Sequence, residues 1–242
     1  MVLIAVGAVD LVRQFVRPPY RRFVLLGTGL AIIVVGVLSA AWLPAILAIA
    51  IAAAWIWLFP LGERARASFW PAIALAIVCG VFVAVLGPRG DAGFIGGSWQ
   101  LATPIGELTF DHTLLLIGAL FIVLESGNVI VRASLMAEMP SAMTAAGADP
   151  GDDGVQAARP ALKGGRLIGP LERIVVFALT LAGIYSLLAA VLAAKGIVRF
   201  PEISRDGDSG DRAEYFLIGS LVSWVVALVA AFLVWWGIIG IA

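Results

Sequence analysis

Long uninterrupted apolar runs dominate the chain and predict membrane-crossing helices. A helix needs about 20 mostly apolar residues to cross the hydrocarbon core of a bilayer. Five runs of that kind contain no charged side chain, and they occupy residues 23–41, 42–60, 69–87, 174–194 and 215–242. A sixth run, residues 113–136, is interrupted near its middle by Glu125, Ser126, Gly127 and Asn128. The pattern predicts an all-α polytopic integral membrane protein with six transmembrane helices.

The segment before these runs has a different pattern. Residues 1–22 begin with a short apolar stretch, but Asp10 and four arginines follow it (Arg13, Arg17, Arg21 and Arg22). The apolar part is too short and the remainder too charged for a comfortable crossing. The arginines follow the apolar stretch, whereas in a secretory signal peptide they precede it. We therefore expect a retained N-terminal interfacial helix over residues 1–22.

The runs divide the chain into segments. Residues 23–136 are expected to hold the first four transmembrane helices, with an outer loop at 88–112. Residues 137–166 are rich in Ala, Gly, Pro and Asp, a composition typical of a flexible linker. Residues 167–242 are expected to hold the last two helices, with an outer loop at 195–214.

Basic residues predict the orientation, because Lys and Arg in short loops stay on the cytoplasmic side. With six crossings, the basic residues before residue 23, between 61 and 68, and between 138 and 173 all lie on one side. Both termini are then cytoplasmic. We expect a multi-pass protein of the bacterial cytoplasmic (inner) membrane.

Composition supports the membrane assignment and narrows the chemistry. Hydrophobic residues make up 62% of the 242 positions and charged residues only 13%, whereas globular chains are about half apolar and a quarter charged. The net charge of zero gives no basic surface for nucleic acid. One cysteine and one histidine exclude an intrachain disulfide and a multi-histidine zinc site. We expect no metal and no cofactor, and the expected partners are membrane lipids, copies of the same chain, or another membrane protein.

Glu125 is the candidate for intramembrane chemistry, because an acidic side chain deep in a span is costly unless it is paired or protonated. Asn128 and Arg132 follow at i+3 and i+7, which places all three on one face of a regular helix. Arg132 is about 10 Å away along the helix axis, so another helix would have to supply the partner of Glu125. Glu125 is then either a proton-relay or substrate carboxylate or, as the favoured alternative, part of a polar clasp between helices.

Two further polar clusters lie near predicted span ends. The cytoplasmic cluster comprises Arg166, Glu172 and Arg173, whose arginines together with Arg132 would hold a lipid phosphate; anchoring of the span by its arginines is the favoured alternative. The outer cluster would bind a phosphate or carboxylate headgroup, or its basic side chains would simply reach toward the interface; it comprises Lys195, Arg199, Glu202, Glu214 and Tyr215.

Three strings in the C-terminal half carry a family resemblance. They are GRLIGPLER at 165–173, AAKGIVRFPEI at 193–203 and AEYFLIGSLVS at 213–223. In this order they resemble an actinobacterial-type family of polytopic bacterial membrane proteins of unknown function. The resemblance implies a membrane protein whose shared polar positions are those of the two clusters, and it implies no activity.

Transport or lipid handling through a polar site in the helix bundle is the function that the sequence favours. A non-catalytic subunit or scaffold that binds partner proteins or itself is the alternative. An intramembrane enzyme is less favoured, because no paired nucleophile and base is visible.

Overall fold

A computed structural model describes residues 1–59, 69–86, 93–99, 101–103, 106–138, 165–203 and 211–239. Within these ranges the chain is almost wholly helical. The first helices are α1 (Val2–Phe15), α2 (Pro18–Leu38), α3 (Trp42–Leu58) and α4 (Trp70–Leu86). A short helix and two three-residue strands follow, namely α5 (Gly93–Ser98), β1 (Leu101–Thr103) and β2 (Gly106–Leu108). The remaining helices are α6 (Phe110–Phe121), η1 (Ile122–Ser126, a π-helical turn), α7 (Gly127–Glu138), α9 (Gly165–Leu181), α10 (Tyr185–Ile203) and α11 (Asp211–Ile239).

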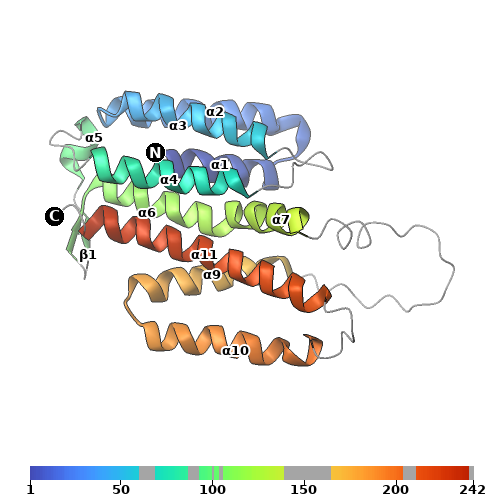
Figure 1. The fold of residues 1–242 in the computed structure, drawn as a ribbon. Helices are drawn as coiled ribbons and strands as arrows, with labels where there is room; N and C mark the ends of the chain where they lie inside the picture. The colour runs from blue at the N-terminus through green and yellow to red at the C-terminus, as the bar shows by residue number, and fades with distance from the viewer. Residues whose placement is uncertain are drawn as a thin grey trace.

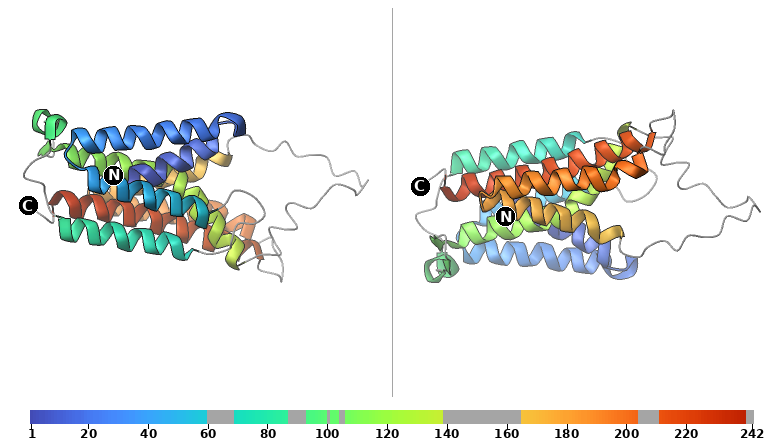
Figure 2. Two further views of the ribbon diagram at one scale, coloured as in Figure 1. Left: turned by 90° about the horizontal axis from the view of Figure 1, so that it is seen from above. Right: turned by 90° about the horizontal axis from the view of Figure 1, so that it is seen from below.

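The long helices lie side by side in one bundle (Figure 1). α11 runs through it and packs on α9, α7, α6 and α4. On the other side α1 packs against α3, α6, η1 and α2. Figure 1 shows α10 at one edge of the bundle, and seen from below it lies in front of the other helices (Figure 2); it packs mainly on α9.

Within the described ranges, three helices are long and apolar enough to cross a membrane: Pro18–Leu38, Phe110–Ala137 and Phe216–Ile238. Helices α3, α4 and α10 contain shorter apolar stretches. The helical class and the membrane character predicted from the sequence are thus supported. The count of six crossings is not confirmed.

The hairpin of α2 and α3 follows the predicted boundary closely. Pro18 and Pro19 occupy the first turn of α2, where the missing N–H of proline costs nothing. In the turn between the end of α2 and the start of α3, Ala40 adopts the left-handed conformation with φ 53°. Small residues let the two helices meet there, since a Cβ on Gly36 would lie 2.4 Å from the Cβ of Ala45.

The first correction concerns residues 1–22. Instead of one interfacial helix, this segment forms α1 and the first turn of α2. α1 lies among its neighbours in the bundle, and the side chains of Asp10 and Arg13 are buried in it. Two of the charges that argued against burial, those of Asp10 and Arg13, form an ion pair.

The second correction concerns the predicted span at residues 174–194. α9 ends at Leu181 and α10 begins at Tyr185, so this run contains a reversal of the chain. Gly183 has φ 69°, its N–H donates to Thr180 O, and Ile184 N–H donates to Leu179 O. This pair of bonds is the Schellman pattern, which ends a helix at a left-handed glycine.

The reversal changes the predicted ends of the bundle. Residues 195–203 belong to α10 and residues 211–214 to α11, so most of the predicted outer loop at 195–214 is helical. The end of α11 lies at the opposite end of the bundle from the junction of α1 and α2 (Figure 1). Two cytoplasmic termini therefore no longer follow from the helix order.

The two remaining connecting segments differ in how far the structure describes them. The predicted outer loop at 88–112 contains α5, an antiparallel pairing of β1 with β2, and the first turn of α6. The ends of the predicted linker at 137–166 belong to α7 and α9, and its residues 139–164 lie outside the described ranges.

Candidate functional site

Arg173 lies at the centre of a buried polar network between α9, α11 and the η1 turn. Its side chain comes from the middle of α9, and the residue is only 1% exposed. Nε donates to Val123 O at 2.6 Å, and Nη2 donates to Leu124 O at 3.2 Å. Both carbonyls belong to η1, where π-helical hydrogen bonding replaces the regular α-helical ladder. The guanidinium therefore satisfies backbone acceptors of the irregular turn.

The same guanidinium reaches two polar side chains. Nη2 donates to Asn128 Oδ1 at 2.6 Å, and Nη1 donates to Ser223 Oγ at 3.3 Å. Asn128 in turn donates through Nδ2 to Glu125 Oε2 at 3.3 Å. Glu125 is buried, and Asn128 lies between its carboxylate and the guanidinium of Arg173. Asn128 thus links the acid to a base from a neighbouring helix.

Gly127 makes room for this arrangement, which gives a testable prediction. A Cβ at position 127 would lie 2.6 Å from Nε and 2.8 Å from Cζ of Arg173. We expect Gly127→Ala to lower the free energy of unfolding by about 1–3 kcal/mol, the usual cost of overpacking a buried site. Chemical denaturation in detergent micelles would measure this loss.

Gly169→Ala is the matched control, because it adds a methyl group beside the same guanidinium without a clash. Its Cβ would lie 3.6 Å from Nη1 of Arg173, an ordinary contact. Alanine also has the higher helix propensity, so the control should be neutral or slightly stabilising. Equal losses of unfolding free energy for the two variants would contradict the close packing of Arg173 against Gly127.

A second buried cluster joins α1 to α3. Asp10 Oδ2 accepts a hydrogen bond from Trp55 Nε1 at 3.0 Å, and its Oδ1 lies 3.5 Å from Arg13 Nη1. Arg13 Nη2 donates to the carbonyl of Phe59, just beyond the end of α3. These contacts tie both charges of α1 to α3.

The two clusters meet at η1. Ser126 places its hydroxyl beside the carboxylate of Asp10, although the hydroxyl makes no hydrogen bond of normal geometry. The preceding residue, Glu125, belongs to the hydrogen-bond network of Arg173 through Asn128. One π-helical turn therefore contributes to polar contacts with α1 and with α9, and each cluster contains one acid and one base. Removal of one partner from a buried ion pair such as that of Asp10 and Arg13 is strongly destabilising, because it leaves an uncompensated charge.

The other predicted site residues do not all join this network. Arg132 is exposed on α7. Glu172 and Lys195 were expected on opposite sides of the membrane, yet Lys195 Nζ lies 2.5 Å from Glu172 Oε2. Glu214 is exposed at the start of α11. The structure does not describe the side chains of four further predicted site residues, namely Arg166, Arg199, Glu202 and Tyr215.

Sequence reasoning missed Asp10, Arg13, Trp55, Ser126 and Ser223. A signal for the first two was present, because an acid and a base three residues apart share one face of a helix and neutralise each other. The roles of Trp55, Ser126 and Ser223 depend on which helices become neighbours, and the sequence offers no direct signal for that.

An apolar groove of about 530 Å³ lies between α4 and the rest of the bundle. α4 contributes Phe69 beside its start and Ala72, Ile73, Leu75 and Ala76; α11 contributes a row from Ile218 to Leu233. Ala119, Ile122, Ile130 and Ser134 line it from the continuous helix α6–η1–α7. The volume lies within the range of about 300–1,000 Å³ typical of ligand pockets.

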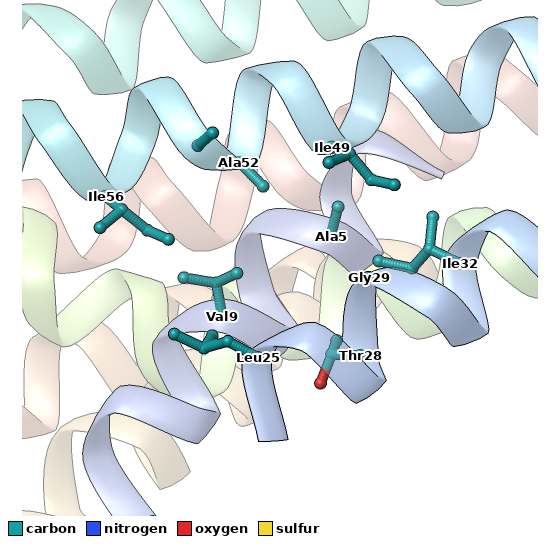
Figure 3. Close-up of a pocket in the computed structure, with 10 residues that line it drawn as sticks. Ala5, Val9, Leu25, Thr28, Gly29, Ile32, Ile49, Ala52 and Ile56 are labelled. Atoms are coloured by element: carbon teal, nitrogen blue, oxygen red, sulfur yellow. The ribbon is translucent and has the colours of Figure 1, made fainter. Parts of the chain in front are cut away.

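A second cavity, of about 110 Å³, lies between α1, α2 and α3. Figure 3 shows Ala5 and Val9 on one side and Ile49, Ala52 and Ile56 on another. Its polar side chain, Thr28, already donates to Val24 O at 2.8 Å. The cavity is too small for a ligand of ordinary size, so we regard it as a packing space.

Within the described ranges, no group of three or more His, Cys, Asp or Glu side chains is placed to hold a metal ion. Comparison with protein families, curated proteins and solved structures found no match for this chain. The resemblance carried by the three C-terminal strings stays a prediction, and function must be argued from the network and the groove.

Proposed function

We propose that this protein is an integral membrane protein that handles lipid, and that the groove between α4 and α11 holds an acyl chain. The observation that carries the proposal is the size and apolar lining of this groove. Among the described residues that line it, Ser134 is the one with a polar side chain, and its hydroxyl already donates to Ile130 O at 3.0 Å. The lining offers apolar contact and no free polar group, so it suits a hydrocarbon chain.

The length of the groove also suits a chain. From Ile218 to Leu233 the lining follows α11 for about 22 Å at 1.5 Å per residue. One leaflet of a bilayer contributes about 15 Å of hydrocarbon. A lipid chain lying along α11 would therefore be covered over its whole length in that leaflet.

The proposed membrane topology has seven crossings, made by α2, α3, α4, α6–α7, α9, α10 and α11. The positive-inside rule supports it. In the six-crossing arrangement the segment 195–214 is external although it contains four basic residues. The extra reversal at Gly183 moves this segment to the side of Arg17, Arg21 and Arg22. We place that side in the cytoplasm.

The buried network favours lipid handling over ion transport. A transported proton or ion needs an acid that can exchange its partner. Glu125 instead shares a buried network in which Asn128 and Arg173 donate to defined acceptors. We interpret the network as the clasp that holds α6–η1–α7, α9 and α11 together beside the groove.

Blocking the groove tests this proposal. Ala76 lines the groove from α4, and we expect Ala76→Trp to lower the amount of lipid that copurifies with the protein about tenfold, since loss of about 1.4 kcal/mol of apolar contact changes a binding constant tenfold. Native mass spectrometry after mild detergent extraction would measure the bound lipid.

Ala84→Trp is the matched control, because Ala84 is exposed on the same helix and does not line the groove. It should retain the lipid content of the unmodified protein. The proposal would be wrong if both variants kept that content, or if both lost it together with their folded structure.

A scaffold function is the second candidate, supported by one observation. Ala72 and Ala76 are small residues that line the groove one helical turn apart, and small residues at this spacing let membrane helices approach closely. A partner's transmembrane helix would then fill the groove. The same mass spectra distinguish the two candidates, because the scaffold would retain a protein of defined mass in place of lipid.

A further inference from the structure

Lys195 lies in a cage of one carboxylate and two aromatic rings supplied by neighbouring helices. Its Nζ is 2.5 Å from Glu172 Oε2 on α9. On α11, the ring centroids of Phe216 and Trp224 lie 5.7 and 5.5 Å from the same nitrogen. Both distances are within the roughly 6 Å at which an aromatic face attracts a cation.

The surroundings of the nitrogen have the composition of an ammonium-binding site. Aromatic faces together with an acid recognise primary and quaternary ammonium groups, because the rings attract the cation while the carboxylate neutralises it. The side chains of Lys195 and Glu172 are 19% and 29% exposed, so the cage reaches the surface of the protein.

Lys195, the residue enclosed by the cage, comes from α10. This helix packs mainly on α9, at the edge of the bundle, and it is joined to α9 by the tight turn at Gly183. The carboxylate and both rings come from α9 and α11, which pack extensively on each other. The receptor part of the cage is therefore built without α10.

We propose that Glu172, Phe216 and Trp224 form a binding site for an ammonium group, and that Lys195 occupies this site as an internal ligand. Withdrawal of Lys195 removes the ammonium group that is paired with the Glu172 carboxylate, so the site takes one monovalent ammonium ion in its place. The ammonium group comes from a lipid headgroup or from a free amine, which share this chemistry.

This site is separate from the groove. On a helix of 3.6 residues per turn, Phe216 and Trp224 lie on the face of α11 turned away from the row that begins at Ile218. The network of Arg173 uses Ser223 and not the two rings. Loss of lipid from the groove therefore neither requires nor excludes ammonium binding here.

Removal of the internal ligand tests the proposal. We expect Lys195→Ala to bind ethylammonium chloride at least about tenfold more tightly than the unmodified protein, in which Lys195 competes. Isothermal titration in detergent micelles would measure the affinities, with potassium chloride at equal concentration as the control for ionic strength and ethanol as the neutral control.

Two double variants show whether the cage is the receptor. Lys195→Ala with Glu172→Gln, and Lys195→Ala with Trp224→Leu, should each lose about tenfold in affinity relative to Lys195→Ala alone. If Lys195→Ala fails to fold, Lys195→Met retains most of the apolar stem and serves in its place. Equal affinity in the unmodified protein and the single variant, or no loss in the double variants, would overturn the proposal.

The source of the ammonium group is decided by a second arm of the experiment. The single variant is placed in nanodiscs of phosphatidylethanolamine or of phosphatidylglycerol, and ethylammonium is titrated into each. Weaker apparent binding in phosphatidylethanolamine identifies the lipid headgroup as a competitor for the cage. Equal binding in both lipids identifies a free amine as the ligand.

Discussion

Arg173→Ala is expected to lower the free energy of unfolding by about 3–5 kcal/mol, because several buried acceptors lose a charged donor worth about 1.5–3 kcal/mol per hydrogen bond. The residue is 1% exposed, and its guanidinium donates to two carbonyls of η1 and to Asn128 and Ser223. Its loss removes the hydrogen bonds that join α9 to η1 and the charged donor of Asn128, which in turn contacts Glu125. Equilibrium unfolding in detergent micelles would measure the change.

Arg132→Ala provides the matched control, because it removes an arginine from the surface of α7. Its effect should stay within about 0.5 kcal/mol, as for most surface substitutions. Adding Glu125→Gln to Arg173→Ala should recover part of the loss, since it removes a buried acid from the same network. Similar losses for the two arginine variants would show that Arg173 does not hold the network together.

Arg13→Ala is the second change with a large expected effect, again about 3–5 kcal/mol. The arginine is buried, pairs with Asp10 and donates to the carbonyl of Phe59. Its removal would leave Asp10 as a buried charge whose remaining hydrogen-bond donor is Trp55. The same unfolding measurement applies.

Arg17→Ala is the control four residues later, where the chain turns from α1 to α2 and the side chain is exposed. It should change stability by no more than about 0.5 kcal/mol. The pair tests the position of α1 directly. An α1 lying on the membrane surface would give small and similar effects for both arginines, which would contradict its burial in the bundle.

Hydropathy predicted those helices whose ends coincide with the ends of their apolar runs. α2, α3 and α4 begin and end within a few residues of the predicted spans, except that α2 extends back to Pro18. For α9 the apolar run gave the wrong helix boundaries, and the reason is physical. Glu172 and Arg173 lie inside the helix because Lys195 and η1 compensate them, whereas a search for uncharged runs cuts the helix at residue 174.

The reversal at Gly183 had a signal in the sequence that an apolar count overlooks. A glycine near the middle of a run is compatible with a single crossing, but it is also the residue that best ends a helix in the left-handed conformation. The run of 21 residues from 174 to 194 has the length of one crossing. Recognition of two helices requires counting the charged residues on both flanks as helical.

Spacing alone predicted the side-by-side placement of Glu125 and Asn128, and in the structure they share a hydrogen bond. Arg132, which was expected on the same face, is exposed on α7. A π-helical turn has more residues per turn than an α-helix, so the residues beyond η1 are rotated relative to a regular helix. Spacing could not predict Arg173, the partner from α9, because the positions of residues within one helix do not show which other helix packs against it.

A density map of the protein in nanodiscs of native lipid tests the lipid-handling proposal most directly. The proposal predicts elongated density between α4 and α11, following the lining from Ile218 to Leu233 and continuous with a lipid headgroup. A closed contact of α4 with α6 and α7, or a helix of another protein in this groove, would contradict it.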